Sequence, residues 1–331
     1  MASRRPCRTS RGTAWRACLL ALSMLMCSGG PAGAEPPPMR PAHGRAVELT
    51  VFSPAMDAPV SVVVLPRHDP SRPAPVLYLL NGIDGGTEGD AWTDRTDVDR
   101  FFADQQVTVV VPVGGAGSYF TDWRADDPVL GRPRWTTFLT RELPPIIDAA
   151  FGGSGANAIA GVSMTGTSVF QLAMAAPGLY QAIGSYSGCV RTSDPAGQAM
   201  VATIVTAEGG TVSNMWGPPG DPAWAANDPY VHADRLRGTT IYVAAGNGQA
   251  GPLDQPHSTG IDGNATKLVD QLAIGGMLEA VSDRCTRSLR DRFQELGVPA
   301  TFDLRPSGTH SWGYWQQDLH NSWPLFESVL R

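Results

Sequence analysis

The stretch that decides the fold is Asn157-Ala-Ile-Ala-Gly-Val-Ser-Met-Thr-Gly166. An apolar run ends, Ser163 follows Gly161 after one residue, and a helical pattern begins at once. This order is typical of the nucleophile elbow, a tight strand-to-helix turn that presents a serine hydroxyl at the top of a sheet. The usual glycine two residues after the serine is Thr165 here, with Gly166 one position later. A serine that only caps the helix is the alternative interpretation.

Short apolar runs alternate with helical patterns on both sides of this turn. The runs over 47–52 and 60–65 alternate like half-buried antiparallel strands. The other strand candidates, of which the first two are continuously apolar, are 76–80, 107–111, 156–160, 182–186, 240–244 and 301–304. Helical patterns cover 136–150, 164–175, 275–296 and the chain from 312 onward. This order predicts an α/β-hydrolase fold, with a mostly parallel sheet covered by helices on both faces.

Residues 46–331 are expected to form one α/β-hydrolase catalytic domain after a Pro-rich linker over 35–45. Within the domain, Pro144 and Pro145 should interrupt the helix predicted over 136–150. The stretch 194–229 is rich in Gly, Pro and Trp. It is the least regular part of the chain and is expected to form an insertion over the active site.

A histidine late in the chain favours the catalytic interpretation of the serine. His310 lies in Ser307-Gly-Thr-His-Ser-Trp-Gly-Tyr-Trp315, directly after the last predicted strand. Hydrolases of this fold have their triad in the chain order serine, acid, histidine. A serine hydroxyl is a weak nucleophile until a base takes its proton, and imidazole can do so near neutral pH. The sequence therefore predicts Ser163 as the nucleophile and His310 as its base.

The acid and the oxyanion hole are less tightly specified by spacing. Asp254 follows the strand predicted over 240–244 and is slightly favoured as the acid, while Glu279 lies on the next predicted helix. The alternative interpretation of each carboxylate is a solvated charge on the protein surface with no catalytic role. One oxyanion donor should be the backbone N–H of Met164, and the second should come from the glycine-rich turn 81–86. That turn lacks the lysine of a phosphate loop.

The first 34 residues have the pattern of a signal peptide. Five arginines precede a short apolar run, and Ala32-Gly-Ala34 is a small-residue cleavage site before Glu35. Without this segment the formal net charge of −6 becomes −11, because five arginines and no acid leave with it. Such an acidic chain is unsuited to nucleic acid, and no other segment is long and apolar enough to cross a membrane. The protein is therefore expected to be secreted or in the cell envelope.

Two cysteines, Cys189 and Cys285, remain after this cleavage. An even number of cysteines in an oxidising compartment favours a disulfide between them, with two buried free thiols as the alternative. No cofactor and no metal site is predicted.

Four groups of residues carry a resemblance to a known family: Tyr78-Leu-Leu-Asn-Gly82, Val111-Pro-Val-Gly-Gly115 with Thr121-Asp-Trp123, Gly161-Val-Ser-Met164, and Gly308-Thr-His-Ser-Trp312 through Trp315. With them the chain resembles the secreted mycolyltransferases of mycolic-acid-bearing actinobacteria, within the esterase D-like group. The family acid is a glutamate on the helix before the last strand, so the resemblance favours Glu279 over Asp254. It also implies the backbone amides of Ile83 and Met164 as the oxyanion donors.

The resemblance further implies a glycolipid acyl donor and a sugar or glycolipid acceptor. Members of the family move a mycolyl chain from trehalose monomycolate to a second trehalose glycolipid or to cell-wall arabinogalactan. The aspartate and arginine that hold the trehalose correspond to Asn81 and Asp84 here, so the arginine is missing. Asn81 is expected to contact the acceptor, and the tryptophans expected to offer apolar faces to sugar rings are Trp92, Trp123, Trp312 and Trp315.

Acyl transfer between glycolipids is thus the leading hypothesis for the function. A secreted carboxylesterase that uses the same triad, with water as the acceptor, is the alternative. A non-catalytic binding or adhesion protein on the same scaffold is a third possibility, and the intact set of Ser163, Glu279 and His310 argues against it.

Overall fold

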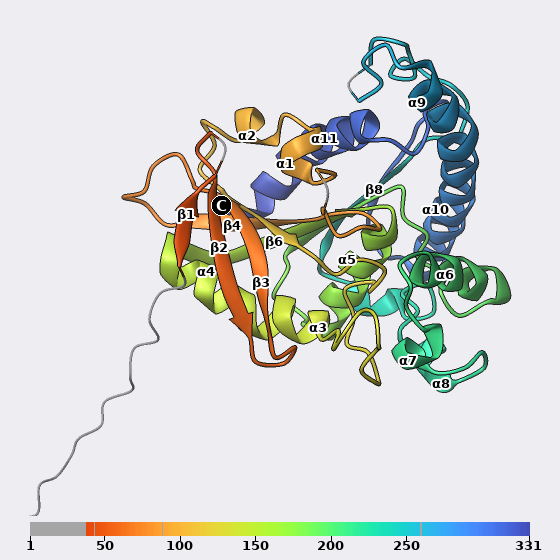
Figure 1. Cartoon of the computed structure of the whole chain (residues 1–331), viewed down its shortest axis with the longest axis horizontal. Helices are drawn as coiled ribbons and strands as arrows, with labels where there is room; N and C mark the ends of the chain where they lie inside the picture. The colour runs from red at the N-terminus through yellow and green to blue at the C-terminus, as the bar shows by residue number, and fades with distance from the viewer. Residues whose placement is uncertain (1–37, 43, 88, 259) are drawn as a thin grey trace, which may run out of the picture. The chain divides into compact units, whose positions relative to one another are not determined.

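The computed structural model describes residues 38–42, 44–87, 89–258 and 260–331. Within these residues, nine strands form one sheet in the order β1-β2-β3-β5-β4-β6-β7-β8-β9 (Figure 1). The strands are β1 Met39–Pro41, β2 Val47–Ser53, β3 Ala58–Leu65, β4 Ala74–Leu80, β5 Thr108–Val113, β6 Gly153–Val162, β7 Ala182–Tyr186, β8 Thr240–Ala245 and β9 Thr301–Leu304. Pairing is antiparallel from β1 through β3 to β5 and parallel from β5 to β9. The predicted mostly parallel sheet is confirmed.

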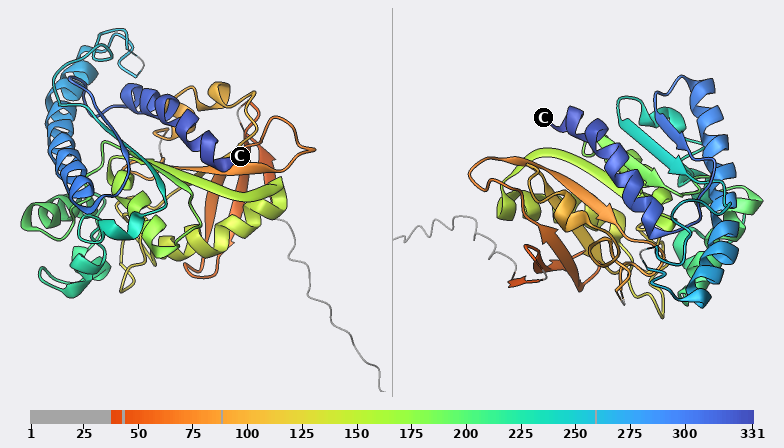
Figure 2. Two further views of the ribbon diagram at one scale, coloured as in Figure 1. Left: turned by 180° about the vertical axis from the view of Figure 1, so that it is seen from behind. Right: turned by 90° about the horizontal axis from the view of Figure 1, so that it is seen from above.

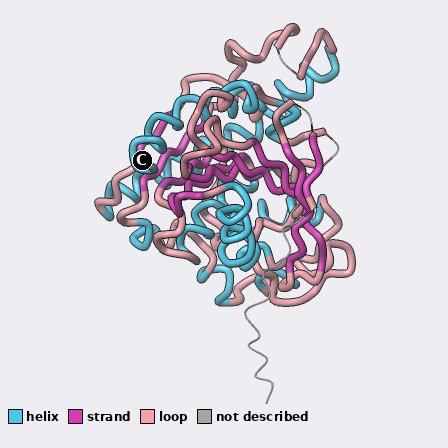
Figure 3. Tube along the Cα trace, turned by 90° about the vertical axis from the view of Figure 1, so that its left-hand side faces the viewer, coloured by secondary structure: helices cyan, strands magenta, loops and turns pink. Residues whose placement is uncertain are grey.

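Helices cover both faces of the sheet (Figures 2 and 3). They are α1 Trp92–Arg95, α2 Val98–Phe101, α3 Trp135–Thr137, η1 Phe138–Glu142, α4 Leu143–Phe151, α5 Met164–Ala175, α6 Pro195–Ala207, α7 Val212–Trp216, α8 Pro222–Ala226, η2 Ala233–Leu236, α9 Ala265–Asp270, η3 Gln271–Gly275, α10 Gly276–Leu296 and α11 Trp312–Leu330. Successive side chains of a strand point to opposite faces. Leu77 and Leu79 of β4 therefore pack with α1, α2 and α11, whereas Tyr78 and Leu80 pack with α4, α5 and α10.

The proline pair does interrupt its helix, as predicted. Pro144 and Pro145 lie in the first turn of α4, where the missing N–H groups have no intrahelical role. The helical segment before them, η1, is a π-helix. The chain thus restarts as an α-helix at Leu143.

The stretch 194–229 is more regular than expected, because it contains α6, α7 and α8. Asp194 caps α6 by accepting a hydrogen bond from the Gly197 N–H at 2.7 Å. A buried face of this helix, with Val201 and Val205, packs into the core.

The expected linker also differs from the structure at three residues. Met39–Pro41 form β1, which pairs antiparallel with β2 through residues 47–49. The expected signal peptide over 1–34 and its cleavage site lie outside the described residues. In the part of the chain that the structure describes, none of the helices is both long and apolar enough to cross a membrane.

Candidate active site

Ser163 stands at the turn between β6 and α5, as the sequence predicted. Its backbone has φ 55° and ψ −121°, in a region that non-glycine residues rarely adopt. The Ser163 N–H donates to the Tyr186 carbonyl at 2.9 Å, which ties the turn to β7. Strain of this kind persists where surrounding contacts hold the backbone, and it is common at nucleophile elbows.

The departure from the usual motif has a structural reason. Thr165 is fully buried, and its hydroxyl donates to the Leu80 carbonyl at 3.2 Å and accepts from the Val162 N–H at 3.0 Å. A threonine therefore ties the elbow to β4. Glycine is required one position later, because a Cβ on Gly166 would lie 2.9 Å from the Gly188 Cα.

A chain of hydrogen bonds joins three of the predicted residues. His310 Nε2 lies 2.8 Å from Ser163 Oγ, and His310 Nδ1 lies 2.8 Å from Glu279 Oε2. The His310 N–H also donates to the Gly275 carbonyl at 3.1 Å, which holds the histidine loop against η3. The imidazole thus bridges a hydroxyl and a carboxylate, the geometry that a serine nucleophile needs.

Glu279 has 0% of its side chain exposed and has other partners besides the histidine. Its Oε1 accepts from Ser187 Oγ at 2.8 Å and from the Gly246 N–H at 2.6 Å. Trp315 Nε1 in turn donates to Ser187 Oγ at 3.0 Å. These donors fix the carboxylate so that Oε2 faces the imidazole. Sequence reasoning missed Ser187 and Gly246, because no spacing rule singles out residues that follow β7 and β8.

Asp254, which spacing slightly favoured as the acid, does not contact His310. It is 4% exposed and contacts the neighbouring Thr309, whose hydroxyl donates to Asp254 Oδ1. Its other donors are the Gly251 N–H at 2.7 Å, Gln271 Nε2 at 2.6 Å and the Tyr314 hydroxyl at 2.8 Å. Burial and the hydrogen bond to Asp254 raise the pKa of Tyr314, so that its hydroxyl stays a donor. The spacing argument was therefore wrong in its preference.

The two predicted oxyanion donors lie on neighbouring segments. Met164 is the first residue of α5, and first-turn N–H groups have no acceptor within their own helix. Ile83 lies in the turn after β4, where its carbonyl accepts from the Gly117 N–H at 2.9 Å. That contact fixes the Ile83–Asp84 peptide, which follows the peptide that carries the Ile83 N–H.

Asn81 and Trp123, two residues expected to contact substrate, are both buried in the structure. Asn81 is 0% exposed, and its Nδ2 donates to the carbonyls of Pro112 at 3.0 Å and Gly85 at 3.3 Å. Its Oδ1 accepts from the Trp92 N–H at 3.0 Å. The Asn81 side chain thus holds its own turn in place through hydrogen bonds to backbone groups. Trp123 is 1% exposed and belongs to the core.

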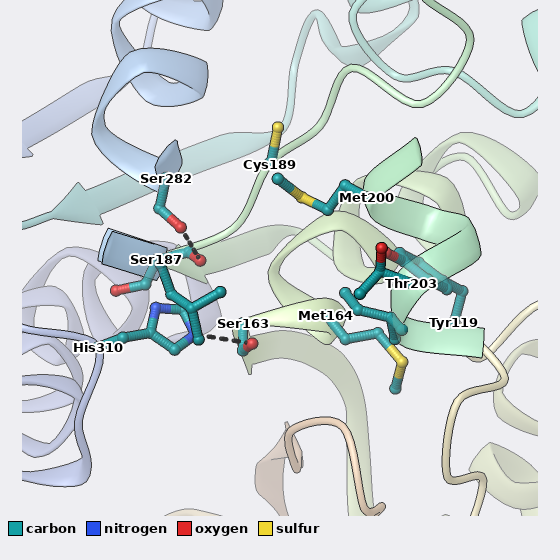
Figure 4. A pocket seen from close by; sticks show the side chains of 11 residues that line it. Tyr119, Ser163, Met164, Ser187, Cys189, Met200, Thr203, Ser282 and His310 are labelled. Carbon is teal, nitrogen blue, oxygen red and sulfur yellow. Dashed lines mark hydrogen bonds between the residues drawn. The ribbon is translucent and has the colours of Figure 1, made fainter. Parts of the chain in front are cut away.

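Two pockets meet at His310. One, of about 230 Å³, is open to Ser163 and has largely apolar walls from Met164, Met200, Ile204 and Leu278 (Figure 4). In that view Ser163 and His310 point toward one another, and Met200 and Thr203 form the opposite wall. Because Met200 and Ile204 belong to α6, the expected insertion does line the active site.

The second pocket, of about 320 Å³, shares His310 and Leu278 with the first and is more polar. Its lining includes Asp90, Arg95, Gln271 and Trp312. Trp312 is 8% exposed, and its Nε1 donates to Asp90 Oδ1 at 2.9 Å. Trp312 and Trp315, two of the tryptophans expected to offer apolar faces to sugar rings, both line this pocket.

The predicted disulfide is present. Cys189, which lines the apolar pocket, is bonded to Cys285 on α10, with 5.0 Å between their Cα atoms. Since α10 also carries Glu279, the bond ties the helix of the acid to the segment after β7. Among the described residues, His, Cys, Asp and Glu side chains form no group of three that could hold a metal ion.

Comparison with known proteins identifies relatives of the chain. The family model named Esterase, for putative esterases, matches residues 53–326. The diacylglycerol acyltransferase/mycolyltransferase Ag85A of Mycobacterium leprae is 30% identical, over 94% of this chain and 92% of that protein. Ag85B of the same organism is 30% identical, over 78% of this chain and 76% of that protein.

Solved structures agree with this assignment. Mycobacterium tuberculosis MPT51 (FbpC1) has a TM-score of 0.67 at 26% identity, with 86% of this chain and 98% of that one covered. An S-formylglutathione hydrolase from Agrobacterium tumefaciens, at 15% identity and a TM-score of 0.64, covers 89% of this chain and 99% of that one and shares the fold. Together with the Ser163–His310–Glu279 geometry, these likenesses show that the chain belongs to the esterase family, as a relative of the Ag85 mycolyltransferases and a serine enzyme of the α/β-hydrolase fold.

Proposed function

We propose that the protein is a secreted serine acyltransferase. It moves a mycolyl or similar long acyl chain from trehalose monomycolate to a glycolipid or cell-wall sugar through an acyl-Ser163 intermediate. The observation that carries this proposal is the meeting of an apolar and a polar pocket at His310. An acyl chain suits the first pocket and a sugar suits the second.

The hydrogen-bond chain supports a two-step reaction. His310 takes the proton of Ser163, whose Oγ attacks the ester carbonyl, and the ester C–O bond breaks as His310 returns the proton to the leaving sugar alcohol. In the second step His310 takes the proton of the acceptor hydroxyl, whose oxygen attacks the acyl-serine carbonyl. The bond to Ser163 Oγ then breaks as His310 returns the proton to that oxygen. Glu279 stabilises the imidazolium in both steps, and the N–H groups of Ile83 and Met164 bind the oxyanion.

The polar pocket supplies groups for an acceptor that Asn81 does not provide. Arg95 pairs with Asp90, with 3.2 Å between Nε and Oδ1, and both line this pocket beside Trp312. An arginine thus stands near the site, although the turn after β4 lacks one. Charged and amide groups beside an aromatic face are suited to the hydroxyls and the apolar face of a sugar ring.

Secretion is part of the proposal and rests on three features. The first 34 residues have a basic region, an apolar run and a small-residue cleavage site. The Cys189–Cys285 disulfide suits an oxidising compartment. None of the described helices could span a membrane.

Mass spectrometry of the intact protein tests the intermediate. After incubation with trehalose monomycolate, we expect a mass increase equal to one acyl group, and no increase in the Ser163→Ala variant. A product ratio then separates transferase from esterase: with several sugar acceptors present, transferred ester should exceed free acid. Orientation of a bound acceptor supplies effective molarities of about 10⁵ M or more, which outcompetes water at roughly 55 M. Free acid as the main product with every acceptor would favour the carboxylesterase alternative.

A further inference from the structure

A buried arginine lies beside the carboxylate of Glu279. Arg305 follows β9, and its N–H donates to the Ala245 carbonyl at 2.9 Å, which continues the β8–β9 pairing by one residue. The next residue is Pro306, which disfavours a helical backbone at position 305. The side chain of Arg305 is 14% exposed, so the strand end delivers a guanidinium into the interior rather than to solvent.

The guanidinium lies between two carboxylates from different helices. Its Nη2 is 3.7 Å from Glu279 Oε1 of α10, and its Nη1 contacts Asp318 Oδ1 of α11. Both carboxyl side chains are 0% exposed. A buried ionised group is costly unless it is paired, so each member of this set depends on the others. Arg305 is therefore held in place by α11 while it faces the carboxylate that contacts His310.

The two cationic partners of Glu279 differ in kind. His310 is charged only after it takes a proton, whereas the guanidinium is always charged. The guanidinium places a permanent positive charge next to the Glu279 carboxylate. It also offsets part of the negative field at the imidazole, which eases return of the proton to the leaving alcohol.

Other ionisable groups, from β7, β8, β9 and α11, lie near this set. Asp303 of β9 accepts from the Tyr242 hydroxyl of β8 at 2.8 Å, and the Tyr314 ring of α11 lies 5.3 Å from Arg305 Cζ. Tyr186 of β7 is also close, and burial keeps its pKa well above the usual value. Burial, with Glu279 and Asp303 nearby, raises the pKa of Asp318 to about 8 against the opposing effect of Arg305.

We propose that Arg305, anchored by Asp318, is a positioning residue for the acyl-transfer reaction. It holds the Glu279 carboxylate in place beside His310 and offsets part of the carboxylate's charge during the proton transfers. This role rests on the proposed function of Ser163, Glu279 and His310. It is distinct from a structural ion pair, because the charge of the guanidinium acts on the proton transfers and not only on the fold.

The test is the pH dependence of kcat/KM for hydrolysis of 4-nitrophenyl butyrate. Arg305→Gln removes a positive charge near the imidazole, so the midpoint of the acidic limb should move to higher pH by about 0.5–1 unit. The plateau should fall roughly 10- to 100-fold, because Glu279 is less firmly placed. Arg305→Lys keeps the charge on a different head group, and its limb should lie between those of wild type and Arg305→Gln.

The matched control is Arg287→Gln on the exposed side of α10, where Arg287 pairs with Asp283 at 2.9 Å. The acidic limb and the plateau of its kcat/KM profile against pH should equal those of the wild-type enzyme. If Arg305→Gln lowers the plateau without moving the limb, or if the control moves the limb equally, the proposal is wrong. If Arg305→Gln does not fold, the Arg305→Lys variant serves as the test. An acidic limb and a plateau of Arg305→Lys equal to those of the wild-type enzyme would then overturn the proposal. Activity that survives in Ser163→Ala would instead overturn the proposed function itself.

Discussion

Glu279 on α10 and Asp254 in the loop after β8 are both buried carboxylates, and both reach the segment that carries His310. Glu279 contacts the imidazole at Nδ1, whereas Asp254 contacts the hydroxyl of the preceding residue, Thr309. One region therefore orients the base and the other orients the loop that carries the base. The comparison teaches that burial and proximity to a catalytic loop do not identify a catalytic acid, because only the group that meets the ring can stabilise its charged form.

The largest effect should come from Glu279→Gln. The amide keeps the shape of the side chain but removes the charge that stabilises the imidazolium, so kcat should fall by about 10⁴-fold. Steady-state hydrolysis of a 4-nitrophenyl ester measures this, with circular dichroism to show that the fold is retained. A loss of less than tenfold would remove Glu279 from the triad.

The disulfide should contribute the next largest effect, because it fixes the helix of Glu279. The bond joins residues that are 96 positions apart, and loss of a disulfide typically costs ~2–4 kcal/mol. Paired replacement of Cys189 and Cys285 by Ala should lower the free energy of unfolding by this amount, as measured by urea denaturation. An unchanged midpoint would show that α10 is held by its packing alone.

Asp254→Asn should affect stability rather than chemistry. In the wild-type protein, Gln271 Nε2 and the Tyr314 hydroxyl donate hydrogen bonds to the Asp254 carboxylate. The asparagine would replace one of the accepting oxygens by an NH₂ group, so that two donors would face each other. We expect a loss of ~1–3 kcal/mol in unfolding free energy, with kcat within tenfold of wild type. The same urea and ester assays apply. If the loss in kcat exceeded that of Glu279→Gln, the assignment of the two regions would be reversed.

A third buried carboxyl group, Asp318, should give the smallest effect, which is visible in the pH dependence of stability. Burial raises the pKa of Asp318 to about 8 from an ordinary 3.8, so the folded state keeps a proton that the unfolded chain releases. This stabilisation is complete below the ordinary pKa and is lost as pH rises through about 8. Asp318→Asn should make the melting temperature fall less between pH 5 and 9, by roughly a few degrees. A slope equal to that of wild type would contradict the raised pKa.

Much of the fold could be predicted from local sequence, because it depends on periodicity. The limits predicted for α5, β7 and β9 match those of the structure, since the apolar pattern changes abruptly at Met164, Ala182 and Thr301. Met39–Pro41 could not be predicted, because an edge strand of three residues has no periodicity and forms only where β2 offers its backbone.

The sequence by itself determined Ser163 and His310, because each lies at a junction of elements that local patterns mark. Spacing along the chain could not decide which carboxylate meets the imidazole, and only the family resemblance favoured Glu279, since Glu279 and Asp254 reach the same loop from distant parts of the chain. Tertiary structure also decided the partners of Asn81. The sequence suggests an amide that is available to a ligand, but in the fold it donates to the Pro112 carbonyl on the neighbouring β5. The direction and the partners of a side chain depend on strands and helices that pack together only in the folded chain, and one-dimensional spacing does not carry that information.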